Sequence, residues 1–196
     1  PIVLNKIDLQ FMPEGGTLVN GYKHTIAFKS LNEFGKATDI EGDIIDEAGF
    51  KVTSFKSYHF GMGKFELTPQ TGKTYYAVIN APAGIKQKYR LPMASVQGLM
   101  LSLTKKEKKI NFTITSTVSM EIKLKGSNHG TTYFQKKITL LQGVNSIVLD
   151  EAVFPPGIAQ FTVYDCNEWP LAERMMFLQE EHRLQVKISF NKPVYN

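Results

Sequence analysis

The sequence of 196 residues lacks most features that point directly to a chemistry. Its single cysteine, Cys166, excludes a disulfide within the chain, although one thiol does not settle the redox compartment. No apolar stretch approaches the roughly 20 residues that a membrane helix needs. The chain also opens without an initiator methionine or a signal-peptide pattern, so we expect a fragment of a longer precursor.

Catalytic and cofactor-binding motifs are equally scarce. The sequence contains no Gly-rich phosphate loop, no serine nucleophile elbow and no Rossmann fingerprint. The histidines occur singly, without the spacing of metal ligands. We therefore expect no enzyme activity, no cofactor and no metal. The four histidines are His24, His59, His129 and His182.

Two groups of residues could still carry chemistry. Cys166 could act as a nucleophile, but it lies in an Asp-Cys-Asn-Glu turn, where an incidental, half-buried thiol is the simpler interpretation. A run of acids could offer oxygens to calcium, but alternating acids are typical of an exposed strand face. These acids are Asp39, Glu41, Asp43, Asp46 and Glu47.

The net charge of +5 could suggest an anionic partner, but the charge is diffuse. The only tight run, from Lys105 to Lys109, lies between two apolar segments and is interpreted as a solvated hairpin turn. No aromatic residues interleave with these lysines, as binding of single-stranded nucleic acid would need. We therefore expect no nucleic-acid partner and no direct insertion of this chain into a membrane.

What the sequence does contain is alternation with a period of two residues. From Phe112 to Leu124, apolar residues occupy one parity and Thr, Ser, Glu and Lys the other. This period excludes a helix, and the length of the run predicts a bend near Ser116. The segment from Ala172 to Glu181 is rich in helix formers, but its all-β context and the preceding Trp169-Pro170 favour a strand.

A repeated arrangement divides the chain. In Leu67 to Ile79 and again in Leu149 to Tyr164, a strand ends, a corner of proline and glycine follows, and an aromatic strand begins. We predict an all-β fold of two tandem immunoglobulin-like sandwiches at residues 1–94 and 95–181. Residues 182–196 would form a linker and, from the alternation at Leu184, Val186, Ile188 and Phe190, the first strand of a third domain.

Several segments carry a resemblance to a known family. They are Phe11 to Gly21, Ile26 to Lys29, His59 to Phe65, Pro69 to Tyr75, Pro156 to Asp165 and Pro170 to Arg174. These segments resemble macroglobulin-type domains of large cell-envelope proteins of Bacteroidetes, which are similar to alpha-2-macroglobulin in their chains of β-sandwich domains. The resemblance implies an exported protein of the periplasm or cell surface, associated with the outer membrane through parts outside this chain.

The same resemblance implies structural rather than catalytic motifs. Family members that trap proteases use a thioester built from Cys-Gly-Glu-Gln, which this chain lacks, so Cys166 is not expected to form one. Other members carry regions that resemble outer-membrane receptor plugs, which leaves a transport or surface-scaffold role open. The expected partners are other domains of the same long chain and envelope or surface proteins.

We therefore predict a non-catalytic scaffolding fragment that mediates protein–protein contacts. Its candidate contact loop is the turn formed by Asp165, Cys166, Asn167, Glu168 and Trp169. The alternatives are an enzyme centred on Cys166 and an adhesin or carbohydrate-binding module. The carbohydrate-binding module would need an exposed aromatic face, for which the candidates are Trp169, Tyr22, Tyr58 and Tyr133.

Overall fold

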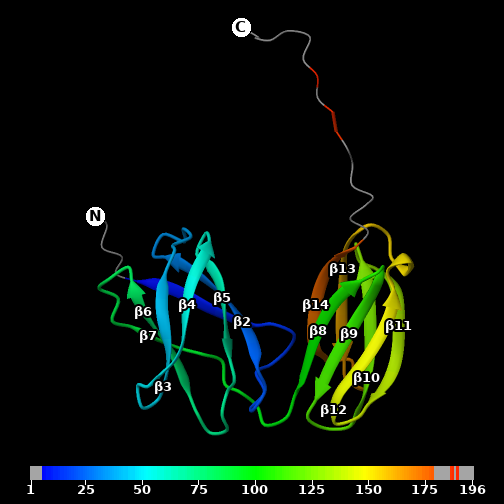
Figure 1. Cartoon of the computed structure of the whole chain (residues 1–196), viewed down its shortest axis with the longest axis horizontal. Coiled ribbons are helices and arrows are strands. Elements are labelled where there is room, and N and C mark those ends of the chain that lie inside the picture. The colour runs from blue at the N-terminus through cyan, green and yellow to red at the C-terminus, as the bar shows by residue number, and fades with distance from the viewer. Residues whose placement is uncertain (1–5, 179–185, 188, 190–196) are drawn as a thin grey trace.

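The computed structural model describes residues 6–178, 186, 187 and 189, and its regular structure is almost entirely β-strand (Figure 1). In the described part of the chain, the only helical element is the short 3-10 turn η1 (Glu151–Val153). The first half contains β1 (Ile7–Pro13), β2 (His24–Asn32), β3 (Glu41–Asp46), β4 (Lys51–His59), β5 (Met62–Leu67), β6 (Tyr75–Ala81) and β7 (Lys88–Arg90). The second half contains β8 (Leu99–Lys106), β9 (Lys109–Ser116), β10 (Met120–Asn128), β11 (Thr131–Leu140), β12 (Gly143–Asp150), β13 (Gly157–Tyr164) and β14 (Pro170–Leu178). The predicted all-β fold class is confirmed.

Each half encloses its own hydrophobic cluster, between residues 7 and 91 in the first half and between 99 and 178 in the second. In the first cluster the ring of Phe28 lies edge-on to Phe55 at 5.1 Å. In the second, Phe161 lies edge-on to both Phe112 and Phe154, at 5.0 and 5.2 Å. Such edge-to-face pairs are the preferred packing of buried aromatic rings and anchor the facing sheets to each other.

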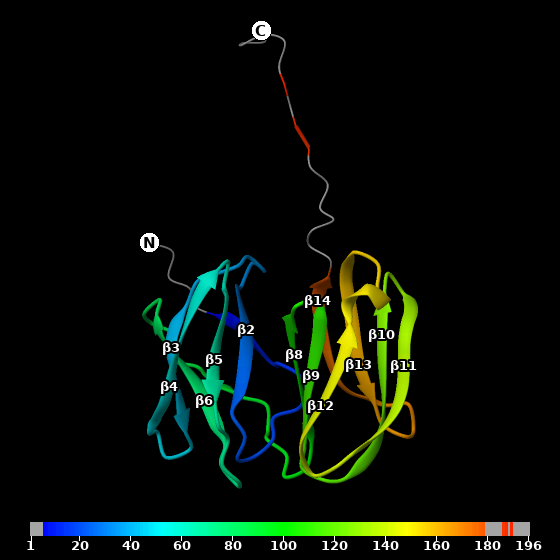
Figure 2. The ribbon, with the colours of Figure 1, turned by 45° about the vertical axis from the view of Figure 1, so that its right-hand side comes forward.

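The two halves share one strand order. In the first half, neighbouring strands follow the orders β1-β2-β5 and β4-β3-β6-β7. In the second half they follow the orders β8-β9-β12 and β11-β10-β13-β14. The second pair of orders repeats the first with every strand number raised by seven. In each half, these two groups of strands face each other as a sandwich (Figure 2). This agreement supports the interpretation of the chain as two copies of one plan.

The halves differ in one connection. In the first, β4 pairs with β3 along Lys51 to Lys56 and then with β5 through Ser57 and His59, which joins all seven strands into one sheet. In the second, β11 and β12 do not pair, and the four-stranded and three-stranded sheets stay separate.

The local predictions of strands and turns agree with the structure. The long alternating run breaks after Ser116, where β9 ends, and resumes at Met120 in the opposite sheet. The lysine-rich run forms the β8–β9 hairpin, with Glu107 and Lys108 at positive φ. The segment that propensity alone would make helical is β14, an edge strand paired with β13. Residues 182–196 lie almost wholly outside the described residues, so the expected third domain stays a prediction.

Candidate functional site

A pocket of about 250 Å³ lies where the two halves meet. We call this region the junction. The lining residues are Glu14, Lys23, His24 and Thr25 from the first half and Met100, Leu101, Ser102, Thr113, Thr115 and Arg174 from the second. The β1–β2 loop reaches across to the edge of β8 in both views of the chain (Figures 1 and 2).

Two adjacent glycines allow this contact. The carbonyl of Gly15 accepts a hydrogen bond of 2.8 Å from the main-chain N–H of Leu101. A Cβ on Gly15 would lie 2.1 Å from the carbonyl oxygen of Leu101, and one on Gly16 would lie 2.6 Å from that of Leu99. Both glycines also have positive φ, at 78° and 132°. Only residues without a side chain can bring this loop against the β8 main chain.

The connection between the halves is also bonded to the first half. Ser95 donates its N–H to Leu18 O at 2.8 Å and accepts from Asn20 N–H at 2.9 Å. Val19, between these two residues, is fully buried. The segment that joins the sandwiches is therefore fixed by a short parallel bridge rather than hanging free.

A salt bridge spans the junction, with 3.1 Å between Arg174 Nη1 and Glu14 Oε2. Both side chains are about one-third exposed, at 31% and 34%. A pair this exposed contributes at most about 1 kcal/mol. Its main effect is to orient β14 relative to the β1–β2 loop.

His24 forms the buried floor of the junction. Its Nε2 lies 2.9 Å from the N–H of Val19 and 3.1 Å from the carbonyl oxygen of Val19, so it accepts from the first when it carries no proton and donates to the second when it does. Burial lowers the pKa of His24 below its ordinary value, and donation from the ring to the carbonyl of Val19 opposes this only in part. The histidine thus holds the loop that carries the junction contacts.

Hydroxyl groups dominate the rest of the pocket. Thr25, Ser102, Thr113 and Thr115 line it, and in the described part of the chain none of their hydroxyls makes a hydrogen bond with protein. These hydroxyl groups can donate hydrogen bonds to, and accept hydrogen bonds from, a polar, uncharged ligand such as a peptide main chain. The lining contains no cysteine, and its carboxylate and histidine are engaged separately, Glu14 with Arg174 and His24 with Val19.

The predicted contact loop forms one tight turn between β13 and β14. Asp165 organises it, since its Oδ1 accepts from the N–H groups of Asn167 and Trp169, both at 2.8 Å. Glu168 forms an ion pair with Lys123, and Trp169 is exposed. Cys166 is exposed, so the expectation of a half-buried thiol is wrong: the residue lies in the turn that connects β13 to β14. The role of the turn in contacts stays a prediction.

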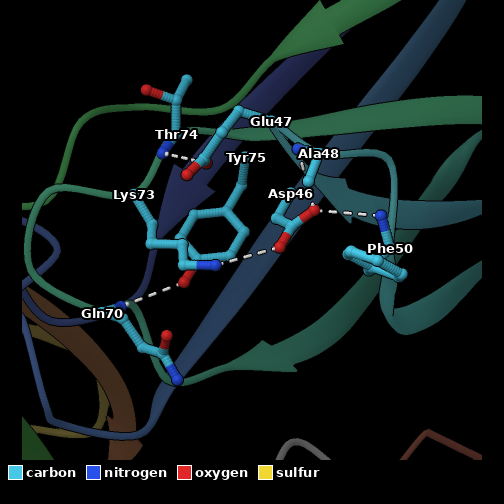
Figure 3. Close-up of polar contacts among 8 residues, drawn as sticks. All are labelled: Asp46, Glu47, Ala48, Phe50, Gln70, Lys73, Thr74 and Tyr75. Carbon is cyan, nitrogen blue, oxygen red and sulfur yellow. Dashed lines mark hydrogen bonds and ion pairs between the residues drawn. The ribbon is translucent and has the colours of Figure 1, made fainter.

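The five acids considered as calcium ligands each have their own protein partners. Asp46 binds Lys73 Nζ at 3.1 Å and accepts from the N–H groups of Ala48 and Phe50, as Figure 3 shows. These contacts, the Lys73 hydrogen bond above all, lower the pKa of Asp46. The others are likewise engaged: Asp39 with Gly61 N–H, Glu41 with Lys56, Asp43 with Lys51 and Ser54, and Glu47 with Thr74 N–H. In the described residues, no group of three His, Cys, Asp or Glu side chains is placed to hold a metal ion.

The aromatic candidates for a sugar-binding face are dispersed. Tyr22 precedes β2, Tyr58 lies on β4, Tyr133 lies on β11 and packs near Phe154, and Trp169 lies in the β13–β14 turn. The structure does not bring these four rings together.

Sequence reasoning missed the junction as a site. In a sequence, adjacent glycines such as Gly15 and Gly16 indicate a sharp turn, and nothing further distinguishes a pair that also approaches another main chain closely. No known protein family matches the chain, and no curated protein matches its sequence. No helix among residues 6–178, 186, 187 and 189 is long and apolar enough to span a membrane.

Proposed function

We propose that this chain is a non-catalytic scaffolding fragment whose two sandwiches are held at a fixed angle and whose surface contacts other proteins. The observation that carries the proposal is the junction, where Gly15 and Gly16 lie directly against the main chain of β8. Two domains that are joined only by a flexible linker need no such contact. A main-chain bond between the halves instead favours a defined relative orientation.

The proposal extends to the setting of the chain. The motifs that resemble macroglobulin-type domains support a place in a long, exported envelope protein, at the periplasm or cell surface. In such a protein, rigid sandwiches would keep distant segments in register. The exposed β13–β14 turn, with Cys166 and Trp169, supports contacts with neighbouring domains or envelope proteins.

The experiment measures the distance between the halves. One spin label is placed on the exposed native thiol of Cys166 and a second on a cysteine that replaces Glu33, which lies in the exposed β2–β3 turn. In the otherwise unchanged chain we expect one narrow distance distribution. Gly15→Ala should broaden it, because the added Cβ cannot be accommodated against Leu101.

Gly72→Ala is the matched control. Gly72 has the same φ of 78° as Gly15, but a Cβ on it would meet nothing within 4 Å. The control should therefore carry the backbone strain without broadening the distribution. A broad distribution in the unchanged chain would contradict the proposal of a rigid scaffold.

A further inference from the structure

The outer edge of β8 is only partly covered. Thr117 N–H donates to Gly98 O at 3.1 Å, which marks these residues as a hydrogen-bonded pair of the β8–β9 ladder. Because such pairs alternate in an antiparallel ladder, the even-numbered residues of β8 bond to β9. The main-chain N–H and C=O groups of Leu99, Leu101, Leu103 and Lys105 therefore point away from β9.

The first half of the chain covers the beginning of this edge. Gly15 bonds to Leu101 N–H, and Gly16 lies against Leu99 O and, at 3.5 Å from its Cβ position, Leu171 O of β14. The loop thus fills the lower part of the seam between β8 and β14, which are edge strands of the facing sheets. No residue of the described chain bonds to the outward main-chain groups of Leu103 and Lys105.

The side chains along the uncovered part suit an added strand. Leu103 on β8 and Met176 on β14 pack against the core but remain only partly buried. An apolar side chain placed between them would complete their burial. On the opposite face, the added strand would meet the hydroxyl groups that line the junction, including those of Ser102 and Thr25.

We propose that the uncovered edge of β8, from Leu103 to Lys105, binds an extended peptide segment of a partner protein by strand addition. The ladder would continue from the Gly15–Leu101 hydrogen bond, which already shows that this edge accepts a main-chain partner. The segment alternates apolar residues, facing Leu103 and Met176, with small polar residues, facing the hydroxyl groups of the junction. The inference rests on the proposed rigid junction, because that contact positions the first hydrogen bond.

The test uses the whole chain and a synthetic peptide of ten alternating valine and threonine residues with a lysine at each end. Amide hydrogen exchange is followed residue by residue by NMR. At saturating peptide, exchange at Leu103 and Lys105 should slow by about tenfold or more. Exchange at Ser102 and Thr104, whose amides already bond to β9, should stay unchanged.

Two controls separate strand addition from other binding. A peptide of similar length with proline at every third position cannot form a ladder and should leave all four amides unchanged. Leu103→Pro removes one outward N–H at an edge position, where proline is tolerated, and should abolish the effect of the alternating peptide. The retained chemical shifts of the β9 amides verify that this variant is folded.

Three outcomes would overturn the inference. If the peptide slowed amide exchange only in β11 or β12, it would bind a different sheet edge from the one proposed. Protection of Leu103 and Lys105 that rises with protein concentration alone would identify a second copy of the chain as the occupant. An absence of protection in a chain whose spin-label distances are narrow would refute strand addition while leaving the rigid scaffold intact.

Discussion

The two halves follow the same strand order but close their sandwiches differently. In each, two residues join the fourth strand to the fifth: Phe60 and Gly61 in the first half, Leu141 and Gln142 in the second. Phe60 and Gly61 both have positive φ, at 45° and 72°, as a tight hairpin turn of the type I′ requires. Leu141 and Gln142 do not, and the chain there crosses to the opposite sheet. The two residues of this turn thus decide whether the fourth and fifth strands pair, which joins both layers of the sandwich into one sheet, or stay in separate sheets.

The largest expected effect tests whether the two cores are energetically separate. Phe161→Ala should lower the free energy of unfolding of the second half by about 3–5 kcal/mol, because the ring is fully buried between Phe112 and Phe154. Phe28→Ala should do the same to the first half. Hydrogen exchange resolved by residue should show each loss within its own half. Equal loss in both halves from either variant would mean a single cooperative unit.

The next prediction concerns the turn that closes the first half. Gly61→Ala should destabilise that half by roughly 1–3 kcal/mol, because the residue keeps a left-handed backbone and its Cβ would lie 2.4 Å from Ser30 O. Urea unfolding followed by β4 and β5 amide signals measures the loss. Gly49→Ala is the control, since Gly49 has a φ of 88° in the β3–β4 turn but open space around it. Equal losses in both variants would refute a steric role for the Ser30 contact.

Acidification should affect the first half before the second. His24 is the only buried histidine among the described residues, and its folded-state pKa lies below the unfolded value of about 6.5. Below that pH the unfolded chain binds a proton that the folded chain resists, so the free energy of unfolding falls as the pH drops from 7 toward 5. Glu14, Lys23 and Arg174 line the same pocket, where Lys23 is ion-paired with Glu66 and Arg174 with Glu14.

Unfolding in urea at several pH values between 5 and 7.5 measures this slope. His24→Gln should remove it, because glutamine does not titrate. A slope that persists in the variant would assign the pH dependence to other groups.

The smallest effect comes from one acid–lysine pair in each half. Asp46 holds Lys73 in the first half, and Asp150 holds Lys109 at 2.6 Å in the second. Lysine contacts lower the pKa of both carboxyl groups, so each contributes stability at neutral pH that is lost as the pH falls below about 4. Asp46→Asn and Asp150→Asn should each lower the melting temperature slightly at pH 7 and not at pH 3. A deficit that remains at pH 3 would show that the turn geometry, not the charge, is responsible.

Much of the fold is predictable because its determinants are local. Alternating residues around Phe112 and Ile114 predict a strand with one buried face, and the structure buries both side chains. Packing overrides propensity in β14, where Ala172 and Leu178 are buried against the core although the segment favours a helix.

The junction could not be predicted in this way. The contact of Gly15 with Leu101 joins residues far apart in sequence, and either residue is fully explained by its local role as a turn or a core position. The open edge at Leu103 is equally hidden, since it depends on where β8 lies in its sheet. Neither property follows from periodicity or spacing.

The Gly15–Leu101 bond also sets an order of events during synthesis. The β1–β2 loop leaves the ribosome early, whereas β8 follows only after all seven strands of the first half. Domains generally fold as units from the N-terminus at synthesis rates of about 5–20 residues per second. If the halves fold as separate units, the first sandwich completes its core before β8 is available to this loop, and the nascent second half docks onto a surface that is already formed.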